Sequence, residues 1–157
     1  MLVELARALV TAGARVGGFL QQTRWSGDTI EGYDLVHPVS GERVALARED
    51  HGVPELCRWT FSEAAFDAAR QWTLEGEHDV VFVEAGRLEA AERGHWPTVA
   101  RALAVQPLTV LSIRRGVLAS VALRLPDPID AIELPAGDHE VERFVARSRR
   151  HYEEEKR

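Results

Sequence analysis

The stretch HDVVFVEAGRLE, residues 78–89, joins an uncharged apolar run to an acidic segment. Val80 to Val83 are apolar and mostly β-branched, which is typical of a strand covered on both faces in a parallel sheet. Glu84 follows at the carboxyl end of this strand, and ligands of such sheets bind beyond the carboxyl ends of the strands. Glu84 is therefore a candidate for ligand chemistry. The structural alternative is a polar residue at which a buried strand reaches solvent.

Helices and strands alternate on both sides of this stretch. Leu108 to Ile113 has the same apolar, β-branched character, and Pro97 suits the first turn of a helix between the two strands. A strand, a helix and a parallel strand form a right-handed crossover unit. Apolar spacing predicts further helices at residues 2–10, 61–72, 118–125 and from 138 onward, a short last strand at 131–134 and a fraying end at 151–157. Thr60 and Glu63 form the pattern of a capping box, and Gly13 is placed to end the first helix.

The remaining strands are expected in the first third of the chain. Residues 15–21, RVGGFLQ, are predicted as a strand whose paired glycines indicate close approach of a neighbouring backbone. Residues 32–36 and 42–47 are two more short strands, joined by the turn segment HPVSGE, and we expect them to form an antiparallel hairpin. This order of elements predicts an α/β layered sheet.

Length, composition and charge narrow the class of protein. The chain has 157 residues, 45% of them apolar, so we expect a single domain over 1–157 with an ordered core of about 1–148. The formal charge of −6 argues against nucleic acid and anionic lipid as partners. No apolar run approaches the about 20 residues that span a bilayer, and no secretion signal is evident. We therefore expect a cytoplasmic protein without membrane contact.

Cysteine and histidine provide little support for thiol or metal chemistry. The single Cys57 excludes an intramolecular disulfide, and we expect it to be structural. The six histidines, at 37, 51, 78, 95, 139 and 151, show none of the spacings of a metal site. We therefore expect no dedicated metal site.

Several segments, taken in order, resemble a known family. They are GARVGGFLQQT at 13–23, EGYDLVHPVSGERVALA at 31–47, RWTFSEAAFDAA at 58–69, DVVFVEAGRLE at 79–89 and LTVLSIRR at 108–115. Over residues 1 to about 134, the chain is similar to the nucleoside-triphosphatase family that includes the cancer-related nucleoside-triphosphatase. It is also similar to a less characterised relative often found near molybdate-transport genes. The resemblance implies a P-loop NTPase fold of the RecA-like kind, with three layers and a mostly parallel sheet, that hydrolyses ATP, GTP and other nucleoside triphosphates with Mg²⁺.

The chain departs from the family pattern at two places. No G-x-x-x-x-G-K-[ST] segment occurs in the 157 residues, so the first strand and the phosphate-binding loop of the family are absent from this sequence. The family pattern Asp-Glu-Ile-Gly-x-Met-Glu aligns with residues 83–89, which places Val83 at the metal-organising Asp and Glu84 at the water-activating glutamate. Phosphoryl transfer depends on positioning and on stabilisation of negative charge. We therefore expect little or no hydrolysis by this polypeptide.

Two interpretations of the absent loop remain open. In the first, the loop is encoded upstream of Met1 and the protein is a nucleoside-triphosphatase that uses Mg²⁺ and a nucleoside triphosphate. In the second, this branch has lost the loop and acts as a non-catalytic, regulatory module that binds a nucleotide or a protein partner. A sheet edge left by the absent strand would favour self-association, so a homo-oligomer is a further expectation.

Two arginines are candidates for contact with phosphate. Arg114 and Arg115 follow the strand at 108–113, and we expect them to emerge on the same edge as Glu84, where guanidinium groups could meet phosphate oxygens. The structural alternative is a solvated helix start.

Two further residues complete the predicted nucleotide site. The resemblance places Glu89 at the second acid of the family pattern; its structural alternative is a surface acid four residues before Arg93 on a helix. Trp25 lies in TRWSGD, which is predicted to be a polar loop, and we expect an exposed ring that could contact a base.

Overall fold

The computed structural model describes residues 1–49 and 58–155, and Cys57 and His51 lie outside the described residues. The strands are β1 (Val16–Gly18), β2 (Leu20–Ser26), β3 (Thr29–Val36), β4 (Arg43–Glu49), β5 (Trp59–Phe61), β6 (Val80–Ala85) and β7 (Leu108–Ile113). The helices are α1 (Leu2–Thr11), α2 (Glu63–Leu74), α3 (Arg87–Ala90), α4 (Trp96–Val105), the 3₁₀ turn η1 (Arg115–Val117), α5 (Leu118–Ala122) and α6 (Asp138–Glu155).

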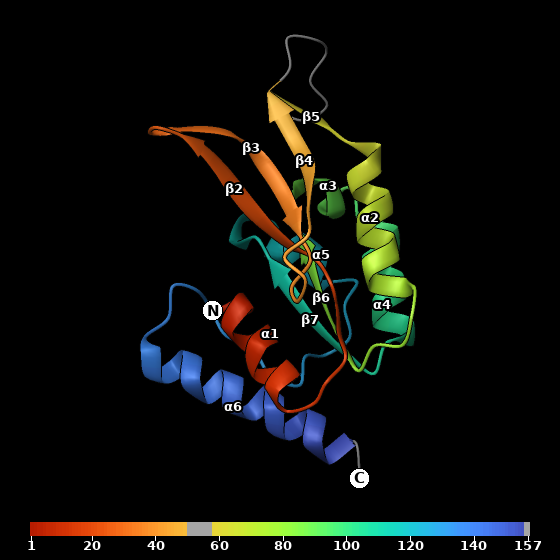
Figure 1. The fold of residues 1–157 in the computed structure, drawn as a ribbon, viewed down its shortest axis with the longest axis vertical. Coiled ribbons are helices and arrows are strands. Elements are labelled where there is room, and N and C mark those ends of the chain that lie inside the picture. Colours follow the sequence, from red (N-terminus) through yellow and green to blue (C-terminus); the bar gives the residue numbers. More distant parts are fainter. Residues whose placement is uncertain (50–57, 156–157) are drawn as a thin grey trace.

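The strands of the described residues form two sheets (Figure 1). A three-stranded parallel sheet has the order β1-β6-β7, and a four-stranded antiparallel sheet has the order β2-β3-β4-β5. The α/β class and the β3–β4 hairpin are confirmed. The expectation of a mostly parallel sheet is wrong, because β2 and β5 pair with the two outer edges of that hairpin and enlarge the antiparallel part.

Helices cover both faces of the parallel sheet, which gives three layers (Figure 1). Val81 and Val83 point into a buried cluster with residues of α2 and α4. Val80 and Phe82 point into a second cluster with residues of α1 and α6. β6 is therefore covered on both faces, as its sequence predicted. The α6 helix continues to Glu155 with a buried Tyr152, so the expected fraying from residue 151 is not seen up to that point.

β7 is one of the two edge strands of the parallel sheet in the described part of the chain, and β1 is the other. It pairs with β6 along its whole length, from Leu108 to Ile113. All six of its residues are nevertheless partly exposed, although their apolar character predicted a strand covered on both faces. The difference arises because no described strand pairs with the far side of β7.

The predicted strand at 15–21 is two strands that belong to different sheets. Gly18 ends β1 with a φ of +91°, and a Cβ at this position would lie 2.0 Å from the Phe82 carbonyl oxygen. The Phe19 amide then donates a hydrogen bond of 2.7 Å to the same oxygen. The paired glycines therefore mark the expected close approach of a neighbouring backbone, and the chain leaves the parallel sheet immediately after them.

Other local predictions are wrong. α2 begins at Glu63 with Ser62 as its N-cap and with no side-chain hydrogen bond at the cap, while Thr60 lies in β5. No strand forms at 131–134, and α5 ends at Ala122 rather than at residue 125.

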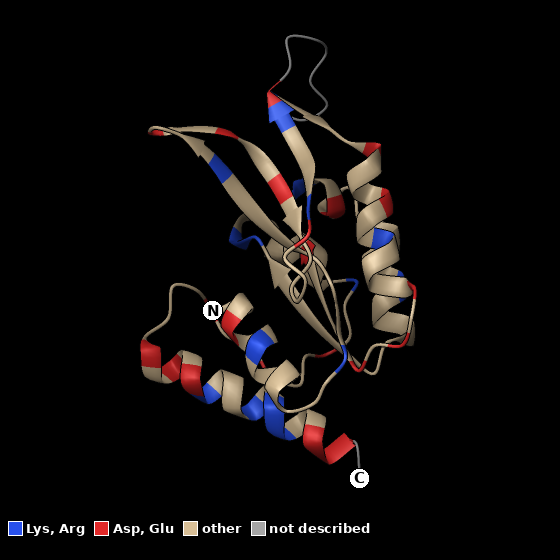
Figure 2. Ribbon diagram, in the orientation of Figure 1, with Lys and Arg blue, Asp and Glu red and all other residues tan. Residues whose placement is uncertain are grey.

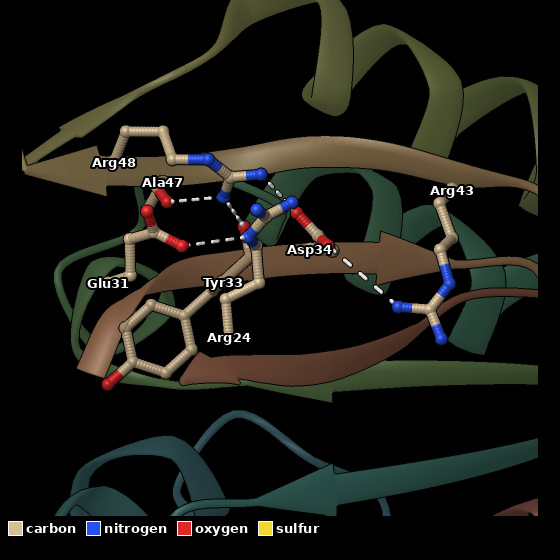
Figure 3. A network of polar contacts seen from close by, with 7 residues as sticks. All are labelled: Arg24, Glu31, Tyr33, Asp34, Arg43, Ala47 and Arg48. Carbon is tan, nitrogen blue, oxygen red and sulfur yellow. Dashed lines mark hydrogen bonds and ion pairs between the residues drawn. The ribbon is translucent and has the colours of Figure 1, made fainter. Parts of the chain in front are cut away.

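The antiparallel sheet contains a polar network around Asp34 (Figure 3). Asp34 is 5% exposed, and its carboxylate pairs with the guanidinium groups of Arg48 and, at 3.8 Å, Arg43. Arg48 also donates hydrogen bonds of 2.8 Å to the carbonyl oxygens of Tyr33 and Ala47. This buried acid is therefore held by cations of the neighbouring strand, which favours a role in sheet stability.

Charged side chains are spread over the outer elements. α6 carries acidic and basic residues along its length, as Figure 2 shows. Within residues 1–49 and 58–155, no helix combines the length and the apolar character that crossing a membrane requires.

Candidate ligand-binding site

A cavity of about 350 Å³ lies at the carboxyl ends of β6 and β7, against the antiparallel sheet. Its polar lining includes Gln21, Glu84, Glu89, His95, Ser112 and Arg114, and its aromatic lining is Tyr33, Trp59, Phe61 and Phe66. We refer to it as the Glu84 cavity. Its position agrees with the rule that α/β sheets bind ligands beyond the carboxyl ends of their strands.

Glu84 is held at the cavity wall by its strand. Its backbone is in register with Ser112 of β7, and its Oε1 accepts a hydrogen bond of 3.0 Å from the Gln21 amide. Burial raises the pKa of the Glu84 carboxyl to about 7; the Gln21 amide opposes this rise and the nearby Glu89 adds to it. Oε2 has no hydrogen-bond partner among the described residues. Glu84 therefore keeps an available acceptor and can hold or release a proton near neutral pH.

Glu89 is a buried acid rather than the surface acid of the structural alternative. It is 4% exposed, and its two oxygens accept backbone hydrogen bonds of 2.8 Å from Gly86 and His95. These bonds join the start of α3 to the start of α4. Because α3 ends at Ala90, the helical pair of Glu89 and Arg93 in the structural alternative does not form. Glu89 therefore ties these two helix starts together beside the cavity, and each of its oxygens already accepts one backbone amide.

His95 was not singled out by the sequence, since no spacing distinguishes it from the other histidines. Its side chain is 2% exposed, and neither ring nitrogen has a hydrogen-bond partner among the described residues. The ring lies 4.5 Å from that of Phe19 and 4.8 Å from that of Phe66, measured between centroids. Burial lowers the pKa of His95 to about 4, so the ring is neutral at pH 7.

The aromatic wall was also missed, because its members come from three separate elements. Tyr33 of β3 and Trp59 of β5 meet edge to face at 5.3 Å, and Phe61 of β5 stacks with Phe66 of α2 at 6.3 Å. These rings make one side of the cavity apolar and suited to a flat ring.

The structure brings only some of the predicted site residues together. Arg114 lines the cavity with Glu84 and Glu89, and its amide donates to the Ala85 carbonyl oxygen at 3.1 Å. Arg115 lies outside the lining and pairs with Glu133.

Trp25 is also outside the cavity lining. It is 61% exposed, as expected, but it lies in β2 beside a β-bulge and not in a loop.

Magnesium does not fit the polar groups of this cavity. Val83, at the position where the family pattern has an acid, is 1% exposed and packs in the apolar cluster under α2 and α4. Each Glu89 oxygen already accepts a hydrogen bond from a backbone amide. Within residues 1–49 and 58–155, no group of three or more His, Cys, Asp or Glu side chains is arranged to hold a metal ion.

Comparison with known proteins agrees with the architecture described above. No protein-family model matches the sequence, and no curated protein matches it. The solution structure of a human cancer-related nucleoside triphosphatase is similar, with a TM-score of 0.69, over 92% of this chain and 87% of that chain. The two sequences are 16% identical. At this identity the likeness shows the fold alone, and this chain therefore has a nucleoside-triphosphatase-like fold.

Proposed function

We propose that this chain binds a nucleotide in the Glu84 cavity and, by itself, hydrolyses it slowly or not at all. The observation that supports binding is the presence of Glu84 and Arg114 in one cavity at the carboxyl edge of a parallel sheet. The aromatic wall suits a base, and the exposed Arg114 guanidinium suits phosphate oxygens. A cavity of about 350 Å³ is large enough for a small ligand.

Weak hydrolysis follows from the charges around Glu84. A carboxyl group can activate water, but the departing phosphate needs cations or amides that stabilise its growing charge. The neighbour of Glu84 is the buried Val83, and the second acid of the cavity is occupied by backbone amides. A loss of about 4 kcal/mol of such stabilisation slows a reaction about a thousandfold.

A phosphate-release assay tests the catalytic half of this proposal. The full chain is incubated with ATP or GTP and Mg²⁺, beside Glu84→Gln and the control Glu140→Gln, which makes the same change on the exposed start of α6. We expect the three proteins to release phosphate at the rate of the buffer. Release by the wild type and Glu140→Gln that is lost in Glu84→Gln would show that Glu84 supports hydrolysis.

Equilibrium dialysis against labelled ATP and GTP tests the binding half. We expect saturable binding by the wild type and weaker binding by Arg114→Ala, because this change removes one of the two arginines, Arg87 and Arg114, that line the cavity. An absence of saturable binding to either nucleotide would refute the proposal.

A second candidate function is protein binding at the β7 edge, and the homo-oligomer is its simplest form. It rests on the partly exposed β7 and on the exposed apolar side chains Leu118, Leu123, Ile129 and Leu134 that follow it. Unpaired strand edges and apolar patches are common interaction surfaces. Light scattering over a wide concentration range tests it: we expect the mass to rise above 17.5 kDa, and a constant monomer mass would count against it.

A further inference from the structure

A groove runs along α6 where this helix lies against α1 (Figure 1). Its volume is about 760 Å³, and its lining shares no residue with that of the Glu84 cavity. α6 contributes one stripe of side chains, spaced three and four residues along the helix from Asp138 to Glu153, and α1 contributes Glu4 and Ala8. We refer to it as the α6 groove. This spacing is that of a single helix face, so the groove follows the axis of α6 for about four turns.

The floor of the α6 groove is apolar and made of small side chains. Ala8 of α1 lines it together with Val141, Val145 and Ala146 of α6. The larger Phe144 of α6 packs instead in the buried cluster beneath the parallel sheet. Small side chains at a contact let the axes of two helices approach to about 8 to 10 Å. The floor is therefore suited to receive another helix.

The charges of the α6 groove are divided between its two ends. Asp138 and Glu142 lie toward the start of α6, and Arg149 and Arg150 lie toward its end, a division that can be followed along the helix in Figure 2. Arg149 bonds with Glu153 at 2.8 Å. Among the described residues, Asp138, Glu142 and Arg150 have no ion-pair partner. The groove therefore has an acidic half and a basic half that do not neutralise each other within one chain.

We propose that a second copy of this chain lays its α6 antiparallel in the α6 groove, so that α1 and α6 of the two copies form a four-helix bundle about a two-fold axis. With the axis between Val145 and Ala146, Glu142 and Arg149 lie equally far from it in opposite directions. Glu142 of each copy then faces Arg149 of the other, and the symmetry makes this ion pair twice. The surface is separate from the β7 edge, and the dimer does not depend on nucleotide binding.

The charges also select the antiparallel arrangement. In a parallel pair the two acidic halves would meet each other, and so would the two basic halves, which is unfavourable. In the antiparallel pair Val141 faces the aliphatic stem of Arg150. The one facing pair of like charge, Asp138 with Glu153, lies at the end of the stripe, where Glu153 already has Arg149 as a partner. Because the apolar floor is short, we expect a weak, reversible dimer whose affinity depends on the ion pairs.

Sedimentation equilibrium of the full chain over a wide concentration range tests the proposal. We expect the mass to rise from 17.5 kDa toward twice that value. Glu142→Arg and Arg149→Glu, each alone, should raise the dissociation constant of the dimer at least about tenfold, because each change creates two facing pairs of like charge. Glu140→Arg, the same reversal at an exposed position of α6 outside the groove, should leave the dissociation constant almost unchanged.

An equimolar mixture of the two single variants provides the sharpest outcome. In a mixed dimer the new base of one copy faces the new acid of the other, and the unchanged Arg149 of the first faces the unchanged Glu142 of the second. We therefore expect the mixture, and likewise the double variant Glu142→Arg/Arg149→Glu, to dimerise nearly as well as the wild type. A misfolded chain would not be rescued in this way, so recovery separates a lost contact from a lost fold.

Each other outcome overturns the proposal. A constant mass of 17.5 kDa at every concentration would show that no dimer forms. A dimer that persists in both single variants would have another interface, such as the β7 edge. A loss that the mixture does not reverse would mean that Glu142 and Arg149 do not face each other. None of these results bears on nucleotide binding in the Glu84 cavity, which shares no lining residue with the α6 groove.

Discussion

Replacing Glu84 by glutamine is expected to stabilise the folded protein, and to do so strongly only above neutral pH. Glutamine keeps the shape of the side chain and an oxygen that can accept the Gln21 amide. It removes the carboxyl group whose ionised form is disfavoured by burial and by Glu89. The folded wild type carries this penalty only when Glu84 is ionised, so the benefit of the change depends on pH.

The size and sign of the effect follow from the pKa of Glu84. It rises from the ordinary 4.5 to about 7, so the stabilising contribution of the protonated group is complete below pH 4.5 and is lost as the pH rises through 7. At about 1.36 kcal/mol per pKa unit, the loss is about 3 kcal/mol at pH 8 and about 1 kcal/mol or less at pH 5. The loss of about 3 kcal/mol at pH 8 is a large part of a total free energy of unfolding of about 5 to 15 kcal/mol.

Urea unfolding at pH 5 and pH 8 measures this difference. With a slope of about 1 to 3 kcal/mol per molar urea, Glu84→Gln should raise the midpoint by about 1 to 3 M at pH 8 and by much less at pH 5. Glu140→Gln, at an exposed position, should leave both midpoints almost unchanged. Equal shifts of the Glu84→Gln midpoint at the two pH values would refute the assignment of a raised pKa to Glu84.

Three other predictions concern residues that shape the fold. Gly18→Ala should prevent folding or lower the free energy of unfolding by more than about 4 kcal/mol, measured by urea unfolding. Gly41 also has a positive φ, but no atom lies within 4 Å of the added Cβ, so Gly41→Ala should lower it by about 1 kcal/mol. Asp34→Asn should lower the free energy of unfolding by about 1 to 3 kcal/mol, because two arginines lose their anion. Glu31→Gln, which removes one side of an exposed ion pair, should lower it by less than about 0.5 kcal/mol. Burial favours the neutral form of His95, so its contribution to stability is complete above pH 6.5 and is lost as the pH falls toward 4. His95→Leu should therefore reduce the drop in melting temperature between pH 7 and pH 5.

The strands and helices that could be predicted are those whose evidence is local. The β-branched run of β6, the apolar spacing of α1 and the paired glycines before Phe19 each depend on neighbouring residues, and the structure agrees with them. The exposure of β7 could not be predicted, because its composition matches that of β6 and only the pairing of strands distinguishes them.

In the candidate site, too, the features with local sequence evidence could be predicted, and those that depend on contacts between distant elements could not. Glu84 and Arg114 could be placed at one edge, since each ends a predicted parallel strand. The burial of Glu89 and of His95 depends on how α3 and α4 meet, and the aromatic wall depends on where the antiparallel sheet lies. These are contacts between elements that are distant in sequence, and no local pattern records them.

Three acids of this chain show why residue type and burial alone do not identify a functional group. Asp34 is neutralised by two arginines, and Glu89 accepts two backbone amides, so each already has the partners that a buried carboxylate requires. Among the residues that the structure describes, Glu84 has a single amide partner, and it lines the cavity. A shared fold fixes the position of such a group, but its function depends on the donors around it. Because no second partner of Glu84 lies among the described residues, a ligand that donates hydrogen bonds is the kind that its carboxylate can hold.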